Sequence, residues 1–204
     1  MAIINGYATL TEFKAVLDIP ADFTAKDSLL ERAIEGASRR IDGWCNRRFV
    51  PAGTAAGSAT ARTFVPQSAR VCYVDDVANT AGFVLRTDTD GDGVFETTWA
   101  ADDYQLEPLN DLSKGRPAYR IMAVDELFPM GNWRAQVQVT ANWGWPAVPH
   151  DVREACLLLA GRQFKRGDAL LGVAGYSDLG PITVRSVDPD VEALLRPYRR
   201  IGVG

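Results

Sequence analysis

Residues 142–155 read NWGWPAVPHDVREA and connect a β-patterned segment to a helical one. A run rich in β-branched residues, 137–140, precedes it and predicts a strand that ends in this aromatic, glycine- and proline-containing corner. A long apolar helix, Val152–Arg166, is expected directly after the corner. Pro149 suits a first helical position, where a missing N–H costs nothing, and Asp151 places negative charge in the first turn. The corner therefore joins a strand to a helix, and nothing in it is typical of a reaction centre.

Two further helices are expected in the first 50 residues. Thr9 and Glu12 have the spacing of a capping box, which predicts a short helix that ends near Pro20. Thr24 or Asp27 is expected to cap a longer second helix. Its apolar residues recur at spacings of one, three and four, as on one face of a helix: Leu29, Leu30, Ala33, Ile34, Ala37, Ile41, Trp44 and Cys45.

This apolar stripe needs a partner, and the helix Val152–Arg166 is the obvious one. The pairing predicts that five residues are buried where the two long helices meet: Ile41, Trp44, Leu158, Leu159 and Phe164.

The middle of the chain has a β pattern. Residues 51–61 are rich in Ala, Gly, Ser and Thr and indicate a loop. Between residues 62 and 145 the alternation of apolar and polar residues favours seven strands: Arg62–Val65, Val71–Val74, Phe83–Thr87, Val94–Trp99, Tyr104–Leu106, Ala118–Val124 and Ala135–Trp143. The expected class is α+β, with a helical bundle built from N- and C-terminal helices and an inserted, mainly antiparallel β-domain. The expected segments are 1–50, the N-terminal helical part, 51–134, the inserted β-domain, and 135–204, the strand, corner and C-terminal helices.

The sharpest local motif is DTDGDG at residues 88–93. Asp88, Asp90 and Asp92 alternate before a glycine, as in the first half of a calcium loop, and Glu96 adds a fourth oxygen ligand. The twelfth loop position holds Trp99, so the bidentate glutamate of an EF-hand is missing. The alternative is a plain hairpin turn, because Asp-Gly pairs favour the positive-φ turns between strands. We expect the plain turn rather than bound Ca²⁺, and no other cofactor.

Other candidate groups have simpler interpretations. His150 is the single histidine, and no Ser or Cys nucleophile lies in a recognisable setting beside it, so an enzyme is not expected. The acidic pairs near strand ends indicate solvated loops. Arg39, Arg40, Arg47 and Arg48 are spread around their helix and indicate ion pairing or a solvated face. The three widely spaced cysteines indicate buried thiols rather than disulfides or a metal site.

Composition and charge narrow the function further. The chain has 204 residues, 47% of them hydrophobic, and no segment long and apolar enough to cross a membrane. Its net charge of −4 is concentrated in residues 51–148, which hold 7 basic and 12 acidic residues. A sequence-specific DNA-binding protein normally has a net basic face. The acidic middle segment therefore suits a surface past which DNA slides without being bound.

The C-terminal part combines apolar residues with a basic end. Leu170, Leu171, Val173 and Tyr176 lie among glycines, and exposed apolar residues of this kind usually contact a partner. Asp188-Pro189-Asp190 predicts a short final helix that Pro197 ends. A helix this short is marginal alone, so we expect it to become ordered on another chain. The expected contact residues in the tail are Arg196, Tyr198, Arg199 and Arg200, since Arg and Tyr anchor interfaces.

The segments 7–49 and 136–200 together resemble the small head-to-tail connector (adaptor) proteins of long-tailed bacteriophages. The shared elements are an N-terminal helical region, a strand that leads into a proline-marked helix, and a short C-terminal helix. The resemblance implies a non-enzymatic virion protein of the neck, assembled in the host cytoplasm, that forms a ring of twelve subunits below the portal. It implies that the ring extends the DNA channel and docks the next neck, stopper or tail protein. By position, 177–204 is then the portal-facing segment and 168–181 the loop that meets a sister subunit. The β-insertion departs from the family pattern, and a calcium-dependent β-binding module is the alternative function.

Overall fold

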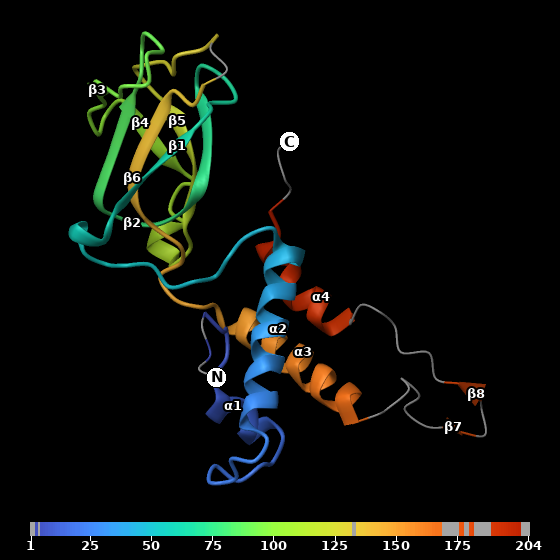
Figure 1. The fold of residues 1–204 in the computed structure, drawn as a ribbon. Coiled ribbons are helices and arrows are strands. Elements are labelled where there is room, and N and C mark those ends of the chain that lie inside the picture. The colour runs from blue at the N-terminus through green and yellow to red at the C-terminus, as the bar shows by residue number, and fades with distance from the viewer. Residues whose placement is uncertain are drawn as a thin grey trace. The chain divides into compact units, whose positions relative to one another are not determined.

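The computed structural model describes residue 3 and residues 5–131, 134–168, 176–177, 180–181 and 189–200. It divides into two compact units, one formed by Met1–Phe49 with Val148–Gly204 and the other by Val50–Ala147. The described residues have the expected α+β class, with four α-helices and a six-stranded antiparallel sheet (Figure 1). None of the described helices is long and apolar enough to span a lipid bilayer.

The first unit holds α1 (Leu10–Val16), α2 (Asp27–Cys45), α3 (His150–Asp168) and α4 (Pro189–Leu195). The predicted capping box of α1 is confirmed, because the Glu12 amide donates to the Thr9 side chain and the Thr9 amide donates to Glu12. The predicted cap of α2 is wrong, since Lys26 occupies the N-cap without a side-chain bond. Pro149 precedes α3, which begins at His150, so the proline is not the first helical residue.

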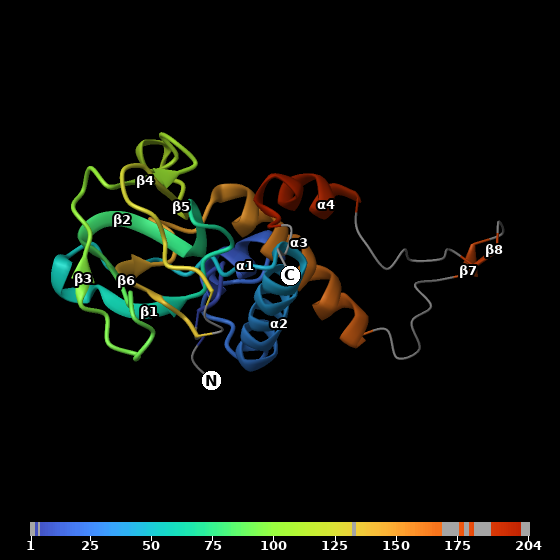
Figure 2. The same cartoon turned by 90° about the horizontal axis from the view of Figure 1, so that it is seen from above.

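The two long helices, α2 and α3, pack against each other (Figures 1 and 2). Ile41 is fully buried and Leu159 is nearly so, as predicted, whereas Trp44 and Phe164 are only half-buried. The prediction for Leu158 is wrong, because its side chain is 41% exposed. Leu158 lies about 200° around the helix from Cys156, which is buried beside Ser38 of α2, and it therefore points away from α2.

The second unit is a sheet in the order β1 (Thr60–Phe64), β6 (Val137–Trp143), β2 (Val71–Thr87), β5 (Ala118–Ala123) and β4 (Tyr104–Glu107), with β3 (Thr97–Thr98) paired to β2. The predicted strands Val71–Val74 and Phe83–Thr87 are the two halves of the single strand β2. The first half pairs with β5 and the second with β6, and the register shifts between residues 77 and 84. Because β6 pairs inside this sheet, the unit extends to Ala147, beyond the segment 51–134 predicted for the β-domain.

One buried side chain, that of Asn142 in β6, holds the irregular middle of β2. Its amide donates to the Asn79 side chain at 2.9 Å and to the carbonyls of Ala81 at 3.0 Å and Ala55 at 3.2 Å. Its oxygen accepts a 2.7 Å bond from the Ser58 hydroxyl. A buried amide that bonds donors and acceptors on two other segments, 55–58 and 79–81, fixes where β2 changes partner.

Candidate functional site

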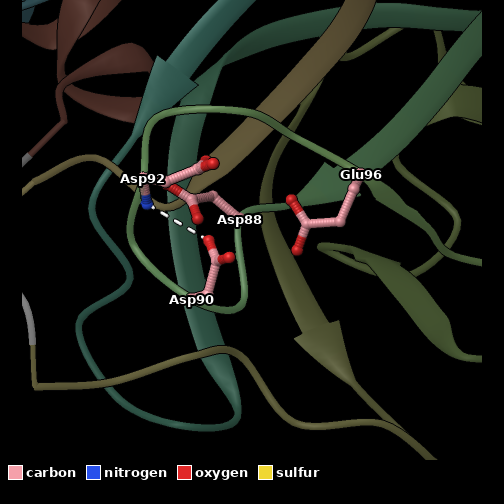
Figure 3. A group of neighbouring side chains, drawn as sticks. All are labelled: Asp88, Asp90, Asp92 and Glu96. Atoms are coloured by element: carbon pink, nitrogen blue, oxygen red, sulfur yellow. Dashed lines mark hydrogen bonds between the residues drawn. The ribbon is translucent and has the colours of Figure 1, made fainter.

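The acidic motif lies in the loop between β2 and β3, directly after the last residue of β2. The structure brings together all four residues that the sequence predicted: one carboxylate oxygen from each of Asp88, Asp90, Asp92 and Glu96 lies within 4.8 Å of the others (Figure 3). The loop also connects paired strands, as predicted, since Arg86 and Thr87 pair with Thr98 and Thr97. Turn and oxygen cluster therefore occur in the same loop.

The aspartates shape this loop through their own backbone. Asp88 is fully buried, and its carboxylate accepts hydrogen bonds from the amides of Gly91 at 2.6 Å and Gly93 at 2.9 Å. Both glycines have positive φ, 80° and 99°, which other residues adopt only with strain. Asp90 accepts from the Asp92 amide at 3.2 Å (Figure 3). These bonds curl the chain so that alternate carboxylates converge.

Glu96 is held over the loop by Thr89, a residue that the sequence analysis did not select. One Glu96 oxygen accepts from the Thr89 hydroxyl at 2.5 Å and from the Thr89 amide at 3.0 Å. These two bonds lower the pKa of Glu96, so its carboxylate stays charged. The available sequence signal was the position of Thr89 inside the Asp-rich turn.

The ligand chemistry of the cluster fits a hard cation. All four groups offer oxygen, and the cluster has no His or Cys that would favour a softer metal. The twelfth loop position has a structural role instead of a ligand role. Trp99 is buried there, and its indole N–H donates to the Thr87 hydroxyl at 3.0 Å. A cation in this loop would be held by Asp88, Asp90, Asp92 and Glu96 without a bidentate glutamate from position twelve.

The predicted subunit-contact loop is described only in part. Leu170, Leu171 and Val173 lie outside the described residues. Tyr176 belongs by its backbone to β7 (Tyr176–Ser177), which pairs with β8 (Gly180–Pro181), and its side chain is likewise outside the description.

The C-terminal tail is part of the first unit, contrary to the expectation that it gains order only on another chain. α4 packs on α3, and Val191 and Leu195 are buried. The 3₁₀ turn Arg196–Tyr198 follows, and the Arg200 amide donates to the carbonyl of Cys45 at 2.9 Å. The short helix is stable here because it buries its apolar face against its own chain.

The four predicted tail contacts therefore separate into two groups. Arg196 and Arg199 are exposed, and Arg200 is half-buried. Tyr198 is buried, with its ring edge-to-face against Phe49 at 5.8 Å, and its role as an interface contact stays a prediction. The sequence carries no signal that distinguishes a tail tyrosine packed in the core of its own chain from one that contacts a partner, because both lie on the apolar side of a short helix and turn.

The C-terminal tail from Tyr198 to Arg200 lies beside the C-terminal end of α2. Arg47 donates to the carbonyl of Tyr198 at 3.3 Å, and the Arg199 guanidinium lies 5.3 Å from the centre of the Trp44 ring. Arg48 is exposed on the same end of α2, 3.9 Å from Asp42. We name Arg47, Arg48, Arg196, Arg199 and Arg200 the arginine cluster. The sequence alone does not link Arg47 and Arg48 to the tail arginines, because they lie in segments near opposite ends of the chain.

The three cysteine thiols and the histidine do not form a reactive group in the described residues. Cys45, Cys72 and Cys156 are free and buried, as predicted. Burial raises the pKa of the Cys72 thiol to about 12 and that of the Cys45 thiol to about 11, so both stay protonated and unreactive at neutral pH. His150 is exposed as the first residue of α3.

Comparison with known proteins gives matches among solved structures. Neither a family model nor a curated protein matches the chain. A chain from the neck of an empty gene transfer agent particle with C6 symmetry matches with a TM-score of 0.58 and 24% identity. Chains from the C12-symmetric neck of the native particle and from its virion match with a TM-score of 0.51 and identities of 23% and 22%. Each match covers 100% of this chain and 96% of the other, so the fold is shared over the full length.

Proposed function

We propose that this chain is a structural protein of the neck of a tailed, phage-like particle. In this proposal copies of the chain form a ring of twelve below the portal, extend the channel for DNA and dock the next neck, stopper or tail component. The protein is not an enzyme, acts in the virion and is assembled in the host cytoplasm.

One observation carries the proposal, namely that the likeness to neck chains spans both units. Helical segments and antiparallel sheets are common separately. A helical unit interrupted by a β-unit, matched over 100% of this chain and 96% of chains from C6- and C12-symmetric necks, is a specific combination. The segments 7–49 and 136–200 point to connector proteins from the sequence side as well. A heterologous contact repeated around an axis gives a ring when the rotation closes. Sixfold and twelvefold cyclic symmetry describe rings of this kind.

The surfaces of the two units suit different contacts. The arginine cluster, with Arg196, Arg199 and Arg200, is proposed to contact the portal, because guanidinium groups pair well with carboxylates. Leu170, Leu171, Val173 and Tyr176 are proposed to meet a sister subunit. The second unit carries most of the net negative charge of the chain and suits a channel in which DNA moves without sequence-specific binding.

The portal contact is tested with charge reversal rather than truncation, because deletion of α4 would remove buried side chains. Arg196→Glu with Arg199→Glu leaves Val191, Leu195 and Tyr198 in place. The double variant should fold and yet give DNA-filled heads that lack tails, counted by negative-stain electron microscopy. Glu192→Arg, on exposed α4 surface, is the matched control and should give tailed particles. Normal yields of tailed, infectious particles from the double variant would contradict portal docking through this cluster.

We also propose that the β2–β3 loop binds Ca²⁺, as a calcium-dependent β-binding module would. The convergence of four carboxylate oxygens within 4.8 Å favours it, because the mutual repulsion of four negative groups is relieved by a cation. This second proposal is independent of the ring, since a neck protein can also carry a structural ion. Titration calorimetry of the full chain with Ca²⁺ tests it: one site should appear that is lost in Asp90→Asn with Asp92→Asn. No heat of binding in the unmodified chain would overturn it.

A further inference from the structure

We propose that one loop surface of the second unit is a docking surface for another protein whose contacting segment is basic and apolar. The surface consists of Asp102, Val124, Asp125, Glu126, Leu127 and Met130, and we name it the acidic–apolar surface. The proposal goes beyond the ring: it concerns the chemistry of a partner and holds whether or not the chain assembles with itself.

Three apolar side chains of this surface are exposed although their neighbour is buried. Val124 is 45% exposed, Leu127 53% and Met130 55%, while Phe128 between them is 2% exposed. Of the four apolar side chains Val124, Leu127, Phe128 and Met130, this loop therefore buries only Phe128. Several exposed apolar residues with acidic neighbours in one loop are typical of a contact area rather than of a solvated turn.

The segment that carries these residues is held in place. Phe128 stacks on Trp99 with 4.8 Å between ring centroids, and its amide donates to the carbonyl of Ala69 at 2.8 Å. The Val124 amide donates to the carbonyl of Asp103, also at 2.8 Å, which ties the segment to the loop that contains Asp102. Because the core fixes both loops, a partner that docks here loses little free energy in ordering them.

The acidic groups of the surface define the charge of the partner. Asp102, Asp125 and Glu126 are exposed. Arg70 donates from its guanidinium to the backbone carbonyls of Ala123 and Val124. The ion pairs described for this unit, Arg62 with Asp75 and Arg120 with Glu107, involve other residues.

Charge argues against two occupants. Duplex or single-stranded DNA is repelled by three exposed carboxylates, and two copies of this surface facing each other would repel for the same reason. A contact with a different, basic surface of a second copy is the remaining alternative, which sedimentation velocity tests. Lysine or arginine side chains around an apolar centre complement both features of the surface. The occupant is therefore a second protein with a basic, apolar segment.

The test uses the full chain and three labelled peptides of equal length. One alternates Lys with Leu, the second replaces every Leu by Ser, and the third replaces every Lys by Glu. Fluorescence anisotropy should show binding of the Lys–Leu peptide, at least tenfold weaker binding of the Lys–Ser peptide and none of the Lys–Glu peptide. Amide chemical-shift changes with the Lys–Leu peptide should lie in residues 100–103 and 124–131.

Two variants and two matched controls separate the site from general stickiness. Leu127→Ser with Met130→Ser, and Asp102→Asn with Asp125→Asn and Glu126→Gln, should each weaken Lys–Leu binding at least tenfold. The controls are Val16→Ser with Leu29→Ser, which are 59% and 51% exposed, and Asp22→Asn with Glu192→Gln, which are exposed acids of the first unit. Both controls should bind within twofold of the unmodified chain.

Three results would overturn the proposal. The first is Lys–Leu binding that both site variants retain. The second is self-association of the unmodified chain in sedimentation velocity that Leu127→Ser with Met130→Ser abolishes, since a second copy would then cover the surface. The third is DNA binding that the carboxamide variant changes. Failure of ring formation in particles bears only on the neck proposal and leaves this one standing.

Discussion

The Tyr198 hydroxyl donates a 2.9 Å hydrogen bond to a carboxylate oxygen of Asp151, in the first turn of α3. The C-terminal turn is thereby fastened to the helix that opens just after the aromatic corner. The Tyr198 ring packs edge-to-face against Phe49, the last residue of the N-terminal segment of the first unit. Residues from both ends of the first unit therefore meet at this tyrosine.

The first prediction is that the tail stabilises the folded chain. Leu195→Ala should lower the free energy of unfolding by about 2–5 kcal/mol, because Leu195 is buried to 1% exposure. Tyr198→Phe should lower it by about 0.5–1.5 kcal/mol through loss of the hydrogen bond to Asp151. Urea unfolding followed by circular dichroism measures both. An unchanged unfolding midpoint in Leu195→Ala would show that α4 is not part of the folded unit.

The second prediction concerns Asn142, whose side chain bonds the irregular middle of β2. Asn142→Ala removes the amide that bonds Ala55, Asn79 and Ala81, and should lower the free energy of unfolding by about 1–3 kcal/mol, because these part-buried acceptors lose their donor. The matched control is Gln138→Ala on the same strand, where the side chain is half-buried. Hydrogen exchange should show faster opening around residues 77–84 in the Asn142 variant alone.

The third prediction is a pH dependence from the cap of α1. Hydrogen bonds from Thr9 hold the pKa of Glu12 below its ordinary value of 4.5. A carboxylate with a lowered folded-state pKa stabilises the fold above its unfolded pKa, and this contribution is lost as the pH falls through the folded value. Glu12→Ala should therefore reduce stability at neutral pH, and the difference from the unmodified chain should shrink as the pH falls through the lowered folded-state pKa of Glu12. A difference that stays constant over this range would contradict the assignment.

The fourth prediction links calcium to stability. If the loop holds Ca²⁺ only when folded, the melting temperature should rise with added Ca²⁺, by the equivalent of about 2.7 kcal/mol at a hundred times the dissociation constant. Asp90→Asn with Asp92→Asn should abolish the rise, and Mg²⁺ at equal concentration should give a smaller one, because Mg²⁺ demands stricter octahedral geometry. A rise that persists in the double variant would place the ion elsewhere.

Local patterns predicted the parts of the fold that depend on neighbouring residues. The capping box at Thr9 and Glu12, the convergence of Asp88, Asp90 and Asp92, and the start of α4 at Pro189 each follow from a few adjacent side chains. Strand pairing depends on distant contacts, so the union of two predicted strands in β2 was missed, since Asn142 supports its middle from another strand.

The same limit applies to surfaces. Apolar side chains at Leu158 and Tyr198 carry equal sequence signals for burial and for partner contact, and only packing decides between them. Leu158 is exposed because Cys156 occupies the face against α2. Tyr198 is buried because Phe49 lies beside it.

Imaging of the head–tail junction shows whether the chain is a ring-forming neck protein. Particles that carry this chain should be reconstructed by cryo-electron microscopy at the junction between head and tail, with symmetry imposed and then released. The account predicts a closed ring of twelve copies below the portal, each with density for the helical unit and the β-unit. A resolved neck without this chain, or the chain at another place in the particle, would contradict it.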